Sequence, residues 1–347
     1  MTSPHFGIFL LTNLPDWSND TEAVHKGIEQ IRRADELGFE EAWVAEHNGR
    51  NYGIISSAQL MLAAAATVTS RIRLGSAVTR LPMHHPLRLA EDFAYVDQLS
   101  KGRLNWGIGK AYDPLEFQAY GIPMAERDER YEEIFDIVMQ AWRTGRVSYQ
   151  GKHYQVPGPG DVTDSVELFP KVYQDPHPPV LVMVSRTEAS LRAAARRNFS
   201  FVLGQLPDRD EVRKLVDIYR EEAREAGHSF DDIDANIARA SQLKALHVAD
   251  STEQAEREYE QGYMWYVNIL SNRAKVGLGI QEFSYREYID NKAVILGSPE
   301  KVAEELAAYH RHTGIGGLLG WFDAGSQPQE QVLEGMRLFA EKVRPQL

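Results

Sequence analysis

Two hydrophobic patterns alternate along most of this chain. Short apolar runs of strand length occupy residues 5–12, 41–48, 71–81, 103–109, 180–184, 199–203, 238–248 and 316–322. Between them apolar residues recur every three or four positions, which predicts helices over 21–38, 57–69, 86–99, 126–142, 188–197, 208–226, 298–312 and 329–343. Gly38 is a predicted helix end, and Ser298 followed by Pro299 is a predicted helix start. Regular alternation of strand and helix with short connections predicts a parallel sheet.

Two segments interrupt this rhythm. Residues 144–179 are rich in Gly, Pro and Tyr, which predicts an inserted hairpin and loop. Residues 251–296 begin with a helical pattern over 252–260 and then read as an irregular aromatic segment. Eight strand–helix pairs with two insertions and no linker predict one α/β domain over residues 1–347, a (β/α)8 TIM barrel, since a minimal barrel needs about 250 residues. An open doubly wound sheet is the second choice, but no Gly-x-Gly-x-x-Gly turn follows the first strand.

Composition excludes several classes of function. The hydrophobic fraction of 43% and charged fraction of 25% are those of a soluble globular protein. The formal net charge of −12 argues against nucleic acid or anionic membranes as partners. Without cysteine the chain has no disulfides and no thiolate metal ligands. No signal-peptide pattern and no apolar run of membrane-spanning length occurs, so we expect a cytoplasmic protein.

The second predicted strand ends in Glu46-His47-Asn48, three polar residues that follow a buried apolar run. In α/β proteins the carboxyl ends of the strands carry the chemistry, so His47 is the candidate reactive centre. A structural histidine that caps a helix or makes a hydrogen bond is the plain alternative. No second ligand stands at metal-binding spacing from His47, so we predict no metal site.

Anion binding is indicated at two other strand ends. Ser185, Arg186 and Thr187 lie between a strand and a helix, where hydroxyls, a guanidinium and free backbone N–H groups suit a phosphate. Lys110 follows a Gly-x-Gly strand end, and Arg127 begins the next helix, so both can add positive charge. An ordinary helix cap with surface arginines paired to nearby acids explains the same residues.

Small residues on the third strand, Gly75, Ser76 and Ala77, would leave room for a flat ligand at the barrel mouth. A flat ligand that bears a phosphate suggests FMN. Ordinary packing inside the barrel is the alternative explanation for these residues.

Several motifs occur together and in a fixed order. They are Phe6-Gly-Ile-Phe-Leu-Leu-Thr12, Glu46-His47, Leu74-Gly-Ser-Ala-Val78 with Leu81-Pro82 and His85-Pro86, Glu91-Asp92, Asp97-Gln-Leu-Ser-Lys-Gly-Arg103, Gly297-Ser-Pro-Glu300, and Met336-Arg-Leu-Phe339 with Val343-Arg-Pro345. Through them the chain resembles bacterial luciferase and the wider luciferase-like, flavin-dependent monooxygenases along essentially its whole length. The stretch 97–103 is the most specific match.

The resemblance implies a TIM barrel with FMN or F420 bound at the carboxyl ends of the strands. It places Glu46 in the family's Glu-His pair and His47 beside the flavin ring. It makes Ala77-Val78 a pair joined by a non-prolyl cis peptide against that ring. It also makes Lys110 and Ser185 the residues that bind the flavin phosphate. Arg127, Arg186 and Thr187 would add to this phosphate site.

Three departures from luciferase bear on activity. Asn48 stands where luciferase has a second histidine, Gly109 lies where it has a cysteine, and Lys110 replaces an arginine. Lysine offers a point charge where arginine offers a fork. These changes favour an ordinary monooxygenase over a light-emitting one.

The resemblance thus predicts an FMN-dependent, two-component monooxygenase that takes reduced FMN from a separate flavin reductase. Such an enzyme would oxidise a small apolar organic substrate with O2 through a C4a-peroxyflavin, with His47 as base or proton donor. Asn48, Trp265 and Tyr266 are the predicted substrate contacts, although a dimer interface or plain core also suits these aromatics. An F420-dependent oxidoreductase and a non-catalytic flavin-binding protein are the rival functions. The resemblance also implies a homodimer.

Overall fold

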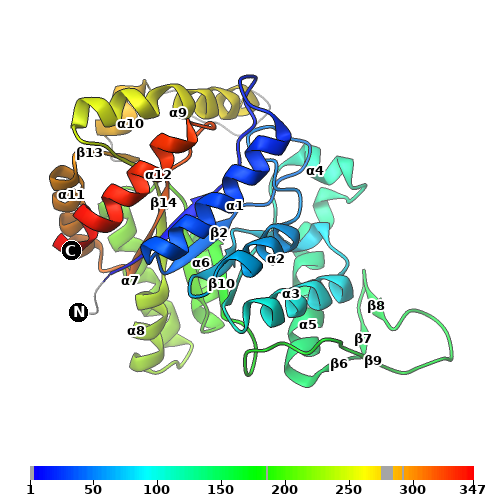
Figure 1. Ribbon diagram of the computed structural model, residues 1–347. Helices are drawn as coiled ribbons and strands as arrows, with labels where there is room; N and C mark the ends of the chain where they lie inside the picture. Colours follow the sequence, from blue (N-terminus) through cyan, green and yellow to red (C-terminus); the bar gives the residue numbers. More distant parts are fainter. Residues whose placement is uncertain (1–3, 185–186, 275–283, 291–292) are drawn as a thin grey trace.

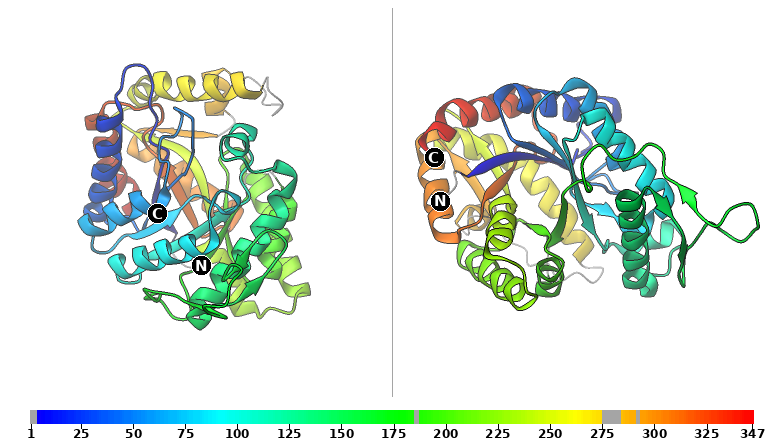
Figure 2. Two further views of the ribbon diagram at one scale, coloured as in Figure 1. Left: turned by 90° about the vertical axis from the view of Figure 1, so that its right-hand side faces the viewer. Right: turned by 90° about the horizontal axis from the view of Figure 1, so that it is seen from below.

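A closed ring of parallel strands forms the centre of the computed structural model, which describes residues 4–184, 187–274, 284–290 and 293–347. Its strands are β1 His5–Leu10, β2 Glu41–Val44, β3 Arg73–Ser76, β5 Leu104–Gly109, β10 Val180–Val184, β11 Ser200–Leu203, β12 Ser241–Val248 and β14 Gly317–Trp321. Parallel pairing of β1 with β14, where His5 lies opposite Gly317, joins the two ends of the chain. Pairing of β5 with β10 completes the ring, which the view from below shows surrounded by helices (Figure 2). The predicted (β/α)8 barrel is confirmed.

Helices cover the outside of the ring (Figure 1). They are α1 Asp20–Leu37, α2 Ala58–Val68, α3 Pro86–Ser100, α4 Pro114–Ala119, α5 Arg127–Thr144, α6 Glu188–Arg196, α7 Arg209–Glu225, α8 Phe230–Arg239, α9 Thr252–Ala274, α10 Tyr285–Asp290, α11 Pro299–Thr313 and α12 Gln329–Leu338. Gly38 ends α1 in the left-handed conformation at φ 79°, and the Ser298 hydroxyl caps α11. Both predicted helix boundaries are therefore confirmed.

Shorter elements complete the chain. The 3-10 turns are η1 Leu81–Met83, η2 Met124–Glu126 and η4 Arg344–Gln346, and a π turn over Phe339–Val343 extends α12. Within 144–179 two antiparallel pairs form, between β6 Arg146–Val147 and β9 Val166–Glu167 and between β7 Tyr149–Gln150 and β8 Gln155–Val156. They extend away from the barrel (Figure 1).

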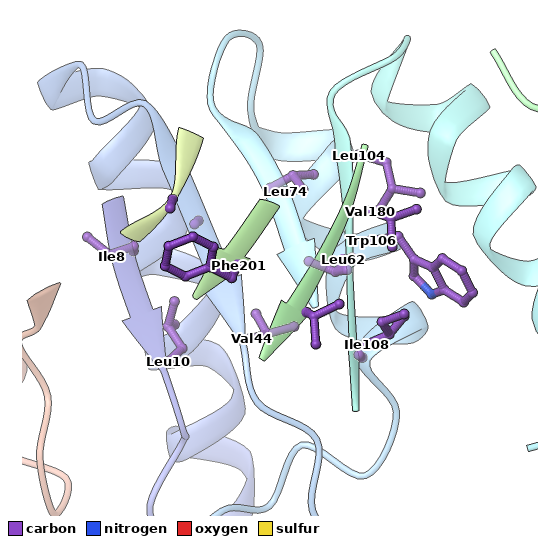
Figure 3. Close-up of a cluster of buried hydrophobic side chains, with 14 of the residues drawn as sticks. Ile8, Leu10, Val44, Leu62, Leu74, Leu104, Trp106, Ile108, Val180 and Phe201 are labelled. Carbon is purple, nitrogen blue, oxygen red and sulfur yellow. The ribbon is translucent and has the colours of Figure 1, made fainter. Parts of the chain in front are cut away.

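Both faces of the strands are buried, in two separate layers. Ile8 and Leu10 point outward into the layer between strands and helices, which Figure 3 shows in close-up. Phe9 and Leu11, on the alternate face, point into the barrel interior. Strands buried on both sides read as continuous apolar runs, which is why these segments were recognisable.

The structure corrects the prediction in several places. The expected strand 238–248 begins only at Ser241, because residues up to Arg239 belong to α8. The expected strand 71–81 ends at Ser76, and a separate two-residue strand, β4 Thr79–Arg80, follows. The expected irregular segment after residue 260 is wrong, because α9 continues to Ala274. An additional strand, β13 Val294–Gly297, pairs with the carboxyl half of β12, while β14 pairs with the other half. Among the described helices, none is long and apolar enough to cross a membrane.

Candidate active site

Glu46 lies at the carboxyl end of β2 and is 1% exposed. Its Oε2 accepts a hydrogen bond of 3.0 Å from the backbone N–H of Ala58, the first residue of α2. Its Oε1 lies 2.9 Å from Nε2 of His84 and 3.1 Å from Nη2 of Arg80. The carboxylate thus joins the end of β2 to a helix start and to the segment after β4.

His47 contacts a carboxylate from a distant part of the chain. Its Nδ1 lies 3.2 Å from Oε1 of Glu116 and 3.1 Å from the hydroxyl of Tyr52. The backbone N–H of Asn48 donates to the same Glu116 oxygen at 3.2 Å. An ionised carboxylate only accepts, so we assign the ring proton of His47 to Nδ1. Nε2 is then the basic nitrogen of the ring.

Arg80 lies between the two glutamates. Its Nη1 is 2.7 Å from Oε2 of Glu116, its Nη2 is 3.1 Å from Oε1 of Glu46, and it also binds Oδ1 of Asn48. The side chain is 3% exposed, so these ion pairs are largely screened from water. We call Glu46, Arg80, Glu116, His47 and His84 the His47 cluster.

Both glutamates of the His47 cluster are held ionised. Burial favours the neutral form of Glu46, but the hydrogen bond from His84 and the charge of Arg80 outweigh it, so the pKa of Glu46 lies below its usual value. Burial likewise opposes ionisation of Glu116. The hydrogen bond from His47 and the charge of Arg80 nevertheless bring the pKa of Glu116 below its usual value.

A second ion pair fixes the helix that carries Glu116. Arg50 donates two hydrogen bonds of 2.8 Å to the two oxygens of Asp113. Asp113 also caps α4 by accepting from the N–H of Leu115 at 3.0 Å. The loop after β2 and the start of α4 are therefore held together, which keeps Glu116 against His47.

The Ala77-Val78 peptide bond is cis, as the resemblance implies. Val78 packs over Gly109, where any added Cβ would approach its methyl carbon to 2.9 Å. The carboxyl ends of β3 and β5 thus meet at this pair. Gly75 has a different role, because a Cβ there would lie 2.3 Å from the Trp43 ring. Indole packing in the barrel accounts for that glycine, so the space ascribed to a flat ligand is filled at position 75.

The structure brings together two of the predicted phosphate-binding cations. Nζ of Lys110 lies 3.1 Å from Oδ1 of Asp128, and Nε of Arg127 lies 3.4 Å from the same oxygen. These two cations outweigh burial in lowering the pKa of Asp128. Thr187 is exposed at the start of α6, and its hydroxyl bonds that of Ser190 at 2.9 Å. Ser185 and Arg186 lie outside the described residues.

The two predicted substrate aromatics lie on α9, which crosses the end of the barrel (Figure 1). The Tyr266 ring lies 4.6 Å from Trp321 and 6.3 Å from Tyr52, whose hydroxyl contacts His47. Trp265 instead meets Trp17, with 6.1 Å between ring centroids. Tyr266 is therefore linked to His47 through one intervening ring, whereas Trp265 lies in a separate aromatic pair.

Sequence reasoning missed the partners of His47. Glu116 lies on a six-residue helix, too short to give a periodic pattern, and stands 69 positions from His47. Arg80 was visible as a charged residue in an otherwise apolar strand end, which is a signal for a buried ion pair. Among the described residues no three His, Asp or Glu side chains form a metal site.

Comparisons with known proteins match nearly the whole chain. Residues 4–314 match the family model of luciferase-like monooxygenases. The alkanal monooxygenase alpha chain of a Kryptophanaron alfredi symbiont is 26% identical, covering 99% of this chain and 98% of that protein. The 4-hydroxyprotoasukamycin monooxygenase of Streptomyces nodosus subsp. asukaensis is 27% identical, covering 98% and 91%.

Solved structures agree along the same length. Monooxygenase RslO1 from Streptomyces bottropensis has a TM-score of 0.86 at 27% identity and covers 98% of this chain and 99% of its own. Two others share the fold at lower identity. The oxygenating constituent of 3,6-diketocamphane monooxygenase from Pseudomonas putida, in complex with FMN, has a TM-score of 0.85 at 23%, covering 99% and 98%. An F420-dependent secondary alcohol dehydrogenase has a TM-score of 0.76 at 17% identity, covering 99% of each chain. This chain belongs to the luciferase-like monooxygenase family.

Proposed function

We propose that this enzyme is an FMN-dependent, two-component monooxygenase that uses O2 and reduced FMN, supplied by a separate flavin reductase, to oxidise a small apolar organic substrate. The observation that carries the proposal is the pairing of His47 with Glu116 at the carboxyl end of β2. A buried carboxylate that fixes the tautomer of a histidine leaves its other nitrogen ready to accept or donate a proton.

The residues at the neighbouring strand ends fit FMN. Lys110 and Arg127 share one carboxylate, so two cations are already gathered where a phosphate would need them. Thr187, with Ser185 and Arg186 before it, would add the groups of a helix start. Ala77 and Val78 would supply a small apolar surface for the isoalloxazine.

FMN, when bound and reduced, would supply the activation of O2. This chain would bind FMN and the substrate, exclude water from the site and move a proton. Nε2 of His47 would exchange that proton with the substrate or the oxygen-derived group, while Glu116 holds the ring in place. The rings of Tyr266 and Trp321 would keep the barrel mouth dry, and Asn48 would contact the substrate.

Rapid mixing tests the proposal directly. The protein is loaded anaerobically with reduced FMN and mixed with oxygenated buffer while the absorbance is followed. A long-lived flavin adduct, spectrally distinct from oxidised FMN, is expected. Immediate formation of oxidised FMN at the rate of free flavin would refute it. His47→Ala should lose coupled turnover, and full coupled turnover in that variant would exclude the proposed role of His47.

An F420-dependent oxidoreductase is the second candidate, favoured by the F420-dependent dehydrogenase that shares this fold. Parallel fluorescence titrations with FMN and F420 distinguish the two, because the true cofactor should bind the more tightly. A non-catalytic flavin-binding protein would bind oxidised FMN tightly and leave the reaction of reduced flavin with O2 unchanged.

A homodimer is part of the proposal. Leu60 on α2 is 73% exposed and Tyr95 on α3 is 59% exposed, and Val68 and Leu99 on the same helices are exposed as well. The two helices pack side by side, so these side chains form an apolar surface on adjacent elements. Apolar side chains gathered on one face are typical of a protein interface.

A further inference from the structure

The His47 cluster carries an excess of negative charge. Glu46 and Glu116 are both ionised, and Arg80 compensates only one of them. All three side chains are at least 97% buried, where an uncompensated charge is costly. One further proton would bring the cluster to neutrality. The imidazole of His47 at one end of the cluster and that of His84 at the other are placed to accept this proton.

The two histidines stand in corresponding positions. Nδ1 of His47 lies 3.2 Å from Glu116, and Nε2 of His84 lies 2.9 Å from Glu46. Their side chains are 12% and 20% exposed. His84 is thus closer to its carboxylate and more exposed to solvent than His47.

We propose that the protonation of His84 and the protonation of His47 oppose each other through Glu46, Arg80 and Glu116, so that the charge on His84 sets the protonation state of His47. This inference rests on the proposed function only in taking His47 as the acid–base group. His84 is accordingly a positioning residue, since it acts on the reaction through His47.

The coupling is electrostatic. A guanidinium does not release its proton at physiological pH, so Arg80 cannot pass a proton between the glutamates. Its charge is nevertheless shared by both. When His84 is protonated, Glu46 is neutralised by a second cation and Arg80 interacts more fully with Glu116. Glu116 then stabilises a charged His47 less, and the two protonations oppose each other.

Other charged and titratable groups near the two rings are already paired. Beside His47, the hydroxyl of Tyr52 lies at 3.1 Å and the Tyr112 ring at 6.5 Å, while Arg50 and Asp113 neutralise each other. Beside His84, Asp92 on α3 lies 3.8 Å from the exposed Arg88. Each outer pair is close to neutral, so Glu46 and Glu116 dominate the two rings.

The test is proton NMR titration of the apoprotein with three variants. His84→Gln keeps an N–H donor toward Glu46 without charge, and His84→Lys places a permanent charge there. His85→Gln is the matched control, because the neighbouring His85 ring lies 6.4 Å from Tyr154 and makes no described contact with the cluster. The chain has 11 histidines, so the His47 signal is assigned by its loss in His47→Gln.

We expect the titration midpoint of His47 to rise by about one pH unit in His84→Gln. A coupling of about one pH unit is the order of magnitude expected for two unit charges that interact across a few buried side chains at an effective dielectric constant of about 20. In His84→Lys the midpoint should stay at or below that of the wild type, and in His85→Gln it should not change. Equal midpoints in the Gln and Lys variants, or no titration of His47 in any of them, would overturn the inference. The apoprotein contains no flavin, so this result is independent of the oxygen reaction that tests the proposed function.

Discussion

Replacing Arg80 by methionine tests the ion pairs of the His47 cluster through stability alone. Arg80→Met keeps much of the apolar stem but leaves Glu46 and Glu116 buried without their shared cation. Removing one partner of a buried ion pair typically costs about 3–5 kcal/mol. At about 2.1 cal/mol/K per residue, 347 residues have an unfolding entropy of about 0.7 kcal/mol/K. The expected fall in Tm is therefore about 4–7 °C.

The loss should depend on pH in a defined direction. In the wild type the pKa of both glutamates is depressed, so their ionisation stabilises the fold above about pH 4.5 and this contribution disappears as the pH falls. In Arg80→Met the histidine hydrogen bonds remain, but burial is no longer opposed by the charge of Arg80, so the pKa of both carboxylates rises. Protonation of the two carboxylates then removes buried negative charge from the folded variant. The stability deficit of the variant relative to the wild type should therefore shrink as the pH falls from 7 to 4.5.

Thermal unfolding followed by circular dichroism at pH 7 and at pH 4.5 measures both effects. Arg88→Met is the matched control, because Arg88 is 71% exposed and its ion pairs with Glu91 and Asp92 lie in solvent. That control should change the free energy of unfolding by less than about 0.5 kcal/mol. A Tm of Arg80→Met within about 1 °C of that of the wild type at pH 7 would refute the reasoning. So would a deficit that grows as the pH falls.

Three further predictions concern the proposed ligands and partner. Lys110→Ala should weaken FMN binding about fivefold, by roughly 1 kcal/mol, yet leave riboflavin binding unchanged because riboflavin has no phosphate; equal losses for both, by fluorescence titration, would place the phosphate elsewhere. Trp265→Ala should change the ratio of kcat/KM between a bulky and a slim apolar substrate by about tenfold or less, and an unchanged ratio would remove Trp265 from the substrate site. Leu60→Glu should convert a dimer to monomers in sedimentation velocity at micromolar concentration, since a charge in an apolar interface is costly; a protein that is monomeric before the change contradicts the proposed interface.

Local signals in the sequence account for most of the fold. Gly38 and Ser298 marked helix ends that the structure has, because capping depends on one or two adjacent residues. The strands were recognisable as apolar runs buried on both faces. Short elements, and elements inside the segments taken as irregular, were not recognisable. α4 has six residues, too few to show a helical period, and β13 begins inside the segment 251–296 that was taken as irregular.

Only part of the site could be predicted from the sequence, for a different reason. His47 stands next to a strand end, so its sequence neighbours indicated its place. Glu116 reaches it across 69 positions and Arg80 across the cis peptide that follows β3, and such pairing depends on tertiary contacts. The aromatic part of α9 was taken as irregular because Tyr, Trp and Gly have weak helix propensity, which packing over the barrel outweighs.

The pairing of β1 with β14 has a consequence for biosynthesis. His5 lies opposite Gly317, so the two strands that close the ring are separated by nearly the whole chain. A ribosome must complete β14 before β1 gains its second neighbour, and until then β1 and the amino-terminal half of β12 present unpaired backbone edges. Closing over such a long sequence separation is slow, and open strand edges invite association with other nascent chains. The yield of active protein in a cell should therefore depend on chaperones that shield the unfinished ring more than on the final stability of the barrel.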